Sequence, residues 1–210
     1  MTTLDPLPSY GDRTPKLIGG LPCLDFVNTV EWRGDPTAWG EHLINYGELI
    51  HWAGAAGLVA RREAKRLLSA AKRDPDAAQT VLKEAVDLRE TLARLLRSPD
   101  LPEESDLARV NRLLAQAPAR GVLSAADGGF AWAGGGESLW RPLWPVLWSA
   151  ADLLTSERLG QVRACSDPRC GWLFLDTSRN RSRRWCAMAD CGNRAKARRH
   201  YARRLEQKGP

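Results

Sequence analysis

Apolar residues recur at helical spacing through most of the chain ahead of residue 160. The longest run covers residues 75–97, and a shorter one covers residues 60–73. The apolar positions of the longer run, which share one helix face, are Val81, Leu82, Ala85, Leu88, Leu92 and Leu95. A third run follows Pro142 and carries Trp144 and Trp148 one turn apart. This spacing predicts amphipathic helices that bury their apolar faces in one core.

Residues that favour helix termini mark where these helices begin and end. Asn45 can cap a short helix with an apolar face, and Asp74 followed by Pro75 has the cap-then-proline pattern of a second start. The segment 98–102 contains two prolines and ends the long helix, after which residues 107–117 form one more. The chain up to this point is therefore predicted to be a series of helices.

A short helix is predicted to begin at Pro22, in the first-turn position that proline favours. Its apolar face comprises Leu24, Val27 and Val30. Asp25 and Asn28 share a different face, and two interpretations are open for them. They either hold a small-molecule effector in a pocket walled by tryptophans or tie neighbouring helices together. The second interpretation is favoured, because buried polar residues usually serve as structural hydrogen-bonding groups.

Two segments lack the helical pattern. Residues 31–40 contain glycine, Asp-Pro and tryptophan and are typical of a loop, whereas residues 122–132, with Asp-Gly-Gly at their centre, predict a β-hairpin. The predicted fold is mainly α, with a mobile arm at 1–16 and an orthogonal helical domain at 17–160 that includes this one small hairpin. Residues 161–210 form a second module of different composition.

Four of the five cysteines fall in this second module, in two matched pairs. Cys165 and Cys170 are separated by four residues, as are Cys186 and Cys191, with 15 residues between the pairs. Two such turns can bring four thiolates to one ion, and Zn²⁺ binds four thiolates tetrahedrally in closed structural sites. The spacing predicts one structural zinc ion, whose binding supplies the folding free energy that so short a segment lacks.

Disulfide bonds and unrelated core cysteines are the alternatives to zinc. No secretory signal is visible in the sequence, and no apolar run has membrane-spanning length. We therefore expect the protein in the reducing cytoplasm, where clustered cysteines are usually metal ligands. Chance core cysteines would not be confined to two matched pairs. A catalytic zinc is not expected, because four thiolates leave no open position for water. Cys23 is predicted to be a small buried hydrophobe.

The module is predicted to be a treble-clef-like or ribbon-like zinc finger that ends in a basic helix. Residues 172–175 are rich in strand-forming types, 176–180 have turn chemistry, and 183–186 are predicted to return as the second strand. Asn193 can cap the final helix. The apolar positions of that helix, expected to pack on the zinc hairpin, are Ala197, Tyr201 and Leu205.

Positive charge is concentrated in the same module. From Arg163 onward the chain has 13 Lys or Arg residues against 4 Asp or Glu, whereas the whole chain carries a net charge of +6. The helical domain is therefore slightly acidic, and the tail predicts a polyanionic partner. The candidate nucleic-acid contacts are Arg183, Arg184, Arg194, Lys196, Arg198, Arg199, Arg203 and Arg204. A basic helix fits the major groove of DNA, where arginine contacts phosphates or guanine.

Three functions are compatible with these features. The leading one is a zinc-dependent DNA-binding regulator whose helical domain senses an effector or forms a homodimer. The second is an RNA-binding or ribosome-associated module with Trp172, Trp185 or Tyr201 as stacking platforms. The third is a protein-interaction module whose charge only keeps it in solution. An enzyme is not expected, since the sequence has no nucleophile–base constellation, phosphate-binding loop or open metal site.

Two stretches resemble known bacterial families. The finger segment contains Cys170-Gly-Trp-Leu-Phe-Leu-Asp-Thr-Ser and then Cys191-Gly-Asn-Arg, and with its basic helix it resembles the CGNR zinc finger over about residues 160–205. The upstream run Leu24-Asp-Phe-Val-Asn-Thr is similar to the start of the ABATE domain, which usually precedes this finger. The resemblance implies a zinc-binding, DNA-binding transcription regulator whose upstream domain responds to stress.

Overall fold

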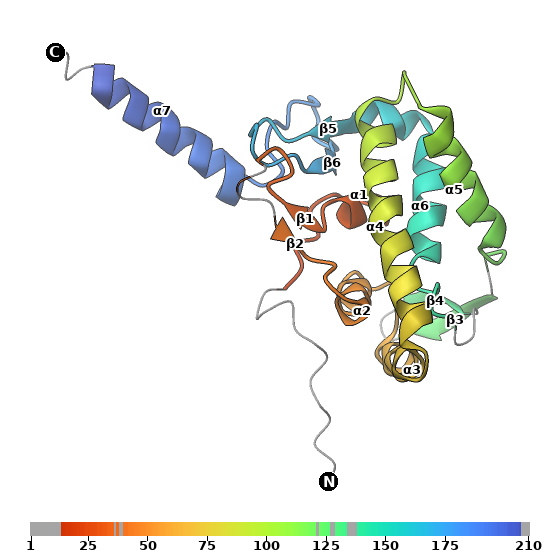
Figure 1. Cartoon of the computed structure of the whole chain (residues 1–210). Coiled ribbons are helices and arrows are strands. Elements are labelled where there is room, and N and C mark those ends of the chain that lie inside the picture. The colour runs from red at the N-terminus through yellow and green to blue at the C-terminus, as the bar shows by residue number, and fades with distance from the viewer. Residues whose placement is uncertain are drawn as a thin grey trace, which may run out of the picture.

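Helices dominate the computed structural model, which describes residues 14–206 except 36, 38, 39, 121, 127, 128 and 134–137. Three helices lie side by side on one flank of the molecule (Figure 1): α4 (Pro75–Arg97), α5 (Glu104–Gln116) and α6 (Trp144–Leu154). Helices α2 (Tyr46–Ala55) and α3 (Arg61–Arg73) pack against α4. The prediction of a mainly α fold is confirmed. The predicted arm lies outside the described residues up to residue 13.

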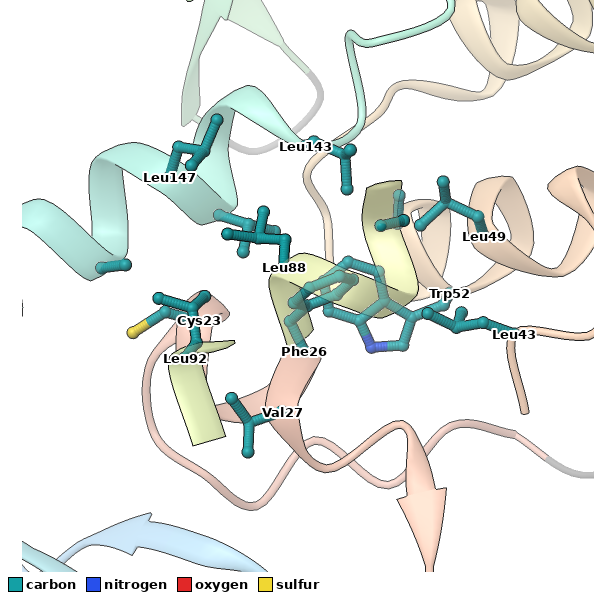
Figure 2. Close-up of a cluster of buried hydrophobic side chains, with 14 of the residues drawn as sticks. Cys23, Phe26, Val27, Leu43, Leu49, Trp52, Leu88, Leu92, Leu143 and Leu147 are labelled. Carbon is teal, nitrogen blue, oxygen red and sulfur yellow. The ribbon is translucent and has the colours of Figure 1, made fainter. Parts of the chain in front are cut away.

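The short helix α1 (Pro22–Val27) lies at the centre of the main core, between α4 and α6. Its Phe26 side chain is fully buried and meets the indole of Trp52 from α2 at 5.2 Å between ring centroids (Figure 2). Cys23 is also fully buried, so the prediction that it serves as a small core hydrophobe is confirmed. Removing a buried aromatic such as Phe26 would cost about 3–5 kcal/mol. This helix therefore anchors the whole domain.

Side-chain caps fix two helix starts where the sequence predicted them. Asn45 accepts a hydrogen bond from the backbone N–H of Glu48 at 3.0 Å, and Asp74 accepts one from Ala77 at 2.9 Å. Each cap satisfies a donor that the first helical turn leaves without a partner. Two other boundaries differ from the prediction, since α5 begins at Glu104 and α6 at Trp144. Both starts lack a side-chain cap, and the local signals that remain are Pro145 in the first turn of α6 and the acidic Glu104 and Asp106 in the first turn of α5.

Small antiparallel pairs of strands interrupt the helices. The predicted hairpin is present as β3 (Val122–Ala126) and β4 (Gly129–Ala133). The segment expected to be a loop, residues 31–40, begins and ends in two two-residue strands, β1 (Val30–Glu31) and β2 (Gly40–Glu41), which pair with each other. Val30 was expected to continue helix α1 but belongs to β1. Its side chain is buried all the same.

The strand pairing in the finger differs from the prediction. Strand β6 (Leu173–Leu175) pairs with β5 (Val162–Ala164), and residues 183–186 form no strand. The difference arises because the edge of β6 opposite β5 is already hydrogen-bonded to the helical domain. The N–H of Leu175 donates to the carbonyl of Gly19 at 2.8 Å, and Asn28 bonds the backbone of Leu173. A returning strand therefore has no edge to join.

Strand β6 divides its side chains between two cores. Leu173 and Leu175 belong to the main helical core, whereas Phe174 and Trp172, just before the strand, pack with the four cysteines. This alternation follows from the two-residue period of a strand, which points successive side chains to opposite faces. The finger is thus built onto the helical domain through a shared strand rather than tethered to it by a linker.

Three further elements complete the described part of the chain. A 3-10 turn, η1 (Glu157–Gln161), leads from α6 into β5, and a π-helical turn, η2 (Met188–Gly192), runs directly into α7 (Asn193–Glu206). Helix α7 projects away from the rest of the molecule (Figure 1). Across the described parts of the chain, no helix combines the length and the apolar character that a bilayer crossing requires.

Candidate metal centre and basic helix

The four cysteines of the finger meet at one point. Their sulfur atoms all lie within 4.8 Å of one another, and all four residues are buried. The Sγ atoms of Cys170 and Cys186 are 3.6 Å apart, and those of Cys186 and Cys191 are 3.5 Å apart. Tetrahedral zinc with Zn–S bonds of about 2.3 Å places its sulfurs about 3.8 Å apart. The donor set and its spacing therefore fit one structural zinc ion held by Cys165, Cys170, Cys186 and Cys191.

Backbone geometry brings the first cysteine pair together. Cys165 directly follows β5 and donates its N–H to the carbonyl of Trp172 at 2.8 Å, so the strand pairing continues to the metal centre. Between the two cysteines the chain turns, and the N–H of Cys170 donates to the carbonyl of Asp167 at 3.0 Å. Gly171 then adopts φ +70°, a conformation that favours glycine. The first knuckle is thus defined by backbone bonds and one glycine.

The second pair is held by the π-helical turn η2 and by Arg194. The N–H of Gly192 donates to the carbonyl of Ala187 at 3.2 Å, which closes the turn around Cys191. Arg194 then reaches back and donates from Nη2 to the Cys191 sulfur at 2.9 Å. A guanidinium beside a thiolate stabilises its negative charge. Arg194, the arginine of the Cys-Gly-Asn-Arg motif, is therefore part of the metal centre's surroundings.

Trp32 of the helical domain packs against this same arginine. The Arg194 guanidinium lies 4.5 Å from the centroid of the Trp32 ring, and that of Arg169 lies 5.1 Å from it. Both contacts have the geometry of cation–π interactions. Trp32 has φ +56°, a left-handed conformation that costs a non-glycine residue about 1–2 kcal/mol. The contacts around Trp32 must offset that cost, and they fix the position of its ring.

Hydrogen bonds join the helical domain to the finger around the metal centre. The Asn28 amide donates to the carbonyl of Leu173 at 2.8 Å and accepts from its N–H at 2.9 Å, as a neighbouring strand would. The indole N–H of Trp172 donates to the carbonyl of Val30 at 2.7 Å. Asp25 accepts from the N–H of Gly19 at 2.7 Å. Asn28, just after α1, therefore ties the helical domain to the finger, whereas Asp25 binds the backbone that precedes α1.

Comparisons with protein families match both halves of this arrangement. Residues 20–157 match the ABATE family, described as "Putative stress-induced transcription regulator". The chain belongs to the ABATE family. Residues 161–204 match the CGNR zinc finger, in the expected order along the chain. Neither is an enzyme family. A comparison with curated proteins gives no match.

Helix α7 of the CGNR finger is exposed along most of its length. Ala195 is its buried residue in the first turn, and every residue from Lys196 to Arg204 is exposed. The prediction that the apolar residues of α7 pack on the zinc hairpin is wrong for Ala197 and for Tyr201, which is 66% exposed. The side chain of Leu205 lies outside the described part of the structure.

Asn193 does not cap α7 as predicted. Its φ of −68° and ψ of −39° are helical, because η2 continues into α7 without a break, and its amide donates to the carbonyl of Ala189 at 3.2 Å. An N-cap residue would instead have an extended backbone and an accepting side-chain oxygen. The preceding π-helical turn, which the sequence pattern did not indicate, moves the helix start upstream.

The eight predicted nucleic-acid residues fall into two groups. Arg183 lies over the Phe174 ring at 4.2 Å and donates to the carbonyls of Trp185 and Cys186, so its guanidinium is turned into the finger. Arg194 is engaged at the metal centre as described. Arg198 lies 3.3 Å from the buried carboxylate of Asp167, and Arg184 lies over Trp185. The second group comprises Lys196, Arg199, Arg203 and Arg204, which lie with Arg198 on the exposed part of α7.

A cavity of about 120 Å³ lies at the junction of the ABATE domain and the finger. Asp25 and Asn28 line it, together with Trp52 of α2 and Trp172 of the finger. Burial raises the pKa of Asp25 to about 6, and hydrogen bonds from the backbone of Gly19 and Ile18 oppose that shift. The sequence suggested tryptophan walls near these two polar residues, and the structure places two there.

Sequence reasoning missed a buried ionic network beside this junction. Arg89 of α4 has a side-chain exposure of 1% and binds both carboxylate oxygens of Glu41, at 2.6 and 2.7 Å. It also binds Glu90, which in turn pairs with Arg33. Arg89 occupies the apolar face of α4, between Ala85 and Leu92. A charged residue on such a face is a signal that could have revealed a buried ion pair.

Proposed function

We propose that this protein is a zinc-dependent DNA-binding transcription regulator. Zinc folds the CGNR finger, and α7 contacts the duplex with its exposed basic residues. The observation that carries the proposal is the exposure of every residue from Lys196 to Arg204 on a helix that projects from the molecule (Figure 1). An isolated helix of about this length is marginally stable in water, so contact with the surface of a binding partner along its length would stabilise it.

The charge on α7 favours a polyanion as that surface. Lys196, Arg199 and Arg203 lie at i, i+3 and i+7, which places them on one face. Arg204 and Arg198 flank this face, and Glu206 is the single acidic residue of the helix. Like charges at this spacing repel each other, and phosphates would relieve the repulsion. A helix of about 10–12 Å diameter also fits the major groove.

Arg183 and Arg194 have a supporting role in this proposal. Both guanidinium groups bind atoms of the finger itself, so they shape the base of α7 and leave DNA contact to the residues beyond it. Arg184 and Arg198 border the same surface and extend it toward the metal centre. Arg198 remains half exposed beside Asp167 and can also reach a phosphate.

The ABATE domain is proposed to sense an effector or to form a homodimer, because one projecting helix offers few base contacts by itself. We place the protein in the cytoplasm, where reducing conditions keep the four thiols ready to bind zinc. No enzymatic activity is proposed, since four thiolates close the coordination sphere of the metal.

Duplex binding by the zinc-loaded protein tests the proposal. Fluorescence anisotropy with a labelled duplex over a series of salt concentrations should give a linear loss of log affinity with log salt. The variant K196Q/R199Q/R203Q should bind more weakly, with the slope reduced by about 0.9 for each phosphate that is no longer neutralised. A matched control is R62Q/K65Q/R66Q, which removes the same charge from the exposed face of α3. Salt-insensitive binding, or an equal decrease in affinity in both variants, contradicts the proposal.

The RNA alternative retains little support. Trp172 is buried with its N–H bound to Val30, and Trp185 is half buried, so Tyr201 alone among the three suggested stacking residues is openly exposed. Single-stranded RNA that outcompetes duplex DNA in the anisotropy experiment would favour this alternative. Capture of a protein partner that persists at high salt would favour the interaction module.

A further inference from the structure

The junction cavity has the dimensions of a small-molecule site. Its volume of about 120 Å³ is close to that of an engineered cavity of about 150 Å³ that binds benzene. Residues from three parts of the fold line it: Asp25, Asn28 and Glu31 around α1 and β1, Trp52 of α2, and Trp172 of the finger. A compact ligand with roughly the size of one ring would therefore contact the ABATE domain and the finger together.

The charged groups of this cavity favour a cation. Two carboxylates, Asp25 and Glu31, line it, and the cationic groups beside them are Lys16 and His42. Lys16 is paired with the carboxylate of Asp190 at 2.9 Å, and His42 lies 3.4 Å from Glu31. Within the described part of the chain, the groups that stabilise the charge of Asp25 are the backbone N–H groups of Gly19 and Ile18, which carry no net charge. A bound cation would supply that missing charge.

Two tryptophans supply the second half of a cation site. Indole rings are the strongest aromatic partners of ammonium and guanidinium groups. Trp52 is 1% exposed, with its ring set against Phe26 in the core (Figure 2). Trp172 is fixed by its hydrogen bond to the carbonyl of Val30. Both rings are therefore held in place before any ligand arrives, which lowers the entropy cost of binding.

We infer that this cavity is a binding site for a small organic cation, with the charge recognised by Asp25 and Glu31 and the alkyl or ring surface by Trp52 and Trp172. The cavity would be the effector site of the proposed regulator, and this regulatory role rests on the proposed function. A second hollow of about 90 Å³ shares Glu31 and Trp172 with it and is also lined by Trp32 and Arg194. A ligand would thus act on residues that hold the base of α7.

Three probes of similar shape test the charge preference: tetramethylammonium, the neutral tert-butanol and the anionic trimethylacetate. Isothermal titration of the zinc-loaded chain, together with the indole N–H signals in nuclear magnetic resonance spectra, reports binding without DNA. Tetramethylammonium should bind saturably and at least about tenfold more tightly than the other two, and should shift the signal of Trp172. Equal binding of all three probes, or no saturable binding of the cation, overturns the inference.

Isosteric variants locate the site. Asp25→Asn and Glu31→Gln should each weaken tetramethylammonium binding about fivefold or more, whereas Glu104→Gln, on the exposed first turn of α5, should leave it unchanged. Thermal unfolding confirms that each variant is folded. Unchanged binding in both cavity variants overturns the assignment. Because no DNA is present, these results stand apart from the duplex experiment, and either proposal can fail while the other holds.

Discussion

The guanidinium of Arg194 lies 4.5 Å from the centre of the Trp32 ring. Arg194 belongs to the CGNR motif of the finger and also binds the sulfur of Cys191, whereas Trp32 belongs to the ABATE domain. This contact therefore links the metal centre, the first turn of α7 and the helical domain. The direction in which α7 projects is set in part by a residue near the other end of the sequence.

Trp32→Ala should loosen the base of α7 without releasing zinc. Removal of its cation–π contacts should weaken duplex binding about threefold to tenfold. Trp32→Phe keeps an aromatic face and should retain most of the affinity. Anisotropy measures binding, and a colorimetric zinc assay should give one zinc per chain in the wild type and both variants. Release of zinc in Trp32→Ala would mean that the ring supports the metal centre itself.

Removal of zinc should destabilise the ABATE domain as well as the finger. Leu173 and Leu175 belong to the main core, and exposing them would cost about 3–6 kcal/mol. Treatment with a strong chelator, or the variant Cys191→Ser, should therefore lower the unfolding temperature of the whole chain in calorimetry. Cys23→Ala, which removes a buried thiol away from the metal, should keep one zinc. Unfolding of the helices at an unchanged temperature after zinc removal would contradict the shared core.

Asp25→Asn should raise the free energy of unfolding at high pH. Burial raises the pKa of this carboxyl from 3.8 to about 6, so the native protein loses stability as pH rises through this interval. Removing the charge should restore about 1–2 kcal/mol at pH 8, after allowance for partial solvent exposure, and nothing near pH 4. Urea unfolding at both pH values measures the difference. The exposed Asp100→Asn should give no such pH-dependent stabilisation.

Arg89→Ala should be severely destabilising. It would leave Glu41 and Glu90 without their shared cation beside the buried face of α4, at a cost of about 3–5 kcal/mol. Arg112→Ala provides the contrast, because its ion pair with Glu84 is 47% exposed at the arginine and is worth less than about 1 kcal/mol. Chemical denaturation of the two variants should separate these values. Similar decreases in stability would show that the Arg89 network contributes no more than a surface pair.

A chain that ends after Ala195 should keep its zinc and its unfolding temperature but no longer bind the duplex. Ala195 is the buried residue of the first turn of α7, and Arg194 remains in place to bind Cys191. The residues from Lys196 to Arg204 are all exposed, and Arg194 remains as an ion-pair partner of the buried Asp167 after Arg198 is lost, so their removal should not affect the core. Retention of full duplex affinity in this shortened chain would locate DNA binding elsewhere.

Local sequence patterns determined the helices, their caps and the metal ligands. The apolar spacing from Val81 to Leu95 defines α4 wherever it packs, and the caps at Asn45 and Asp74 depend only on neighbouring residues. The paired spacing of the cysteines implies the metal centre in the same way, because each knuckle is a local turn. Each of these features depends on residues that are close together in the sequence.

The tertiary structure alone decided which strand pairs with β6 and what each arginine does. Asn28 occupies the edge of Leu173, which lies 145 residues away, so the expected second strand has no place to pair. Arg183 and Arg194 look like Arg199 and Arg203 in sequence, yet the first two bind atoms of the finger while the last two lie on the exposed part of α7. Contacts between distant segments depend on how the helices pack, and that packing cannot be predicted from the pattern of neighbouring residues in the sequence.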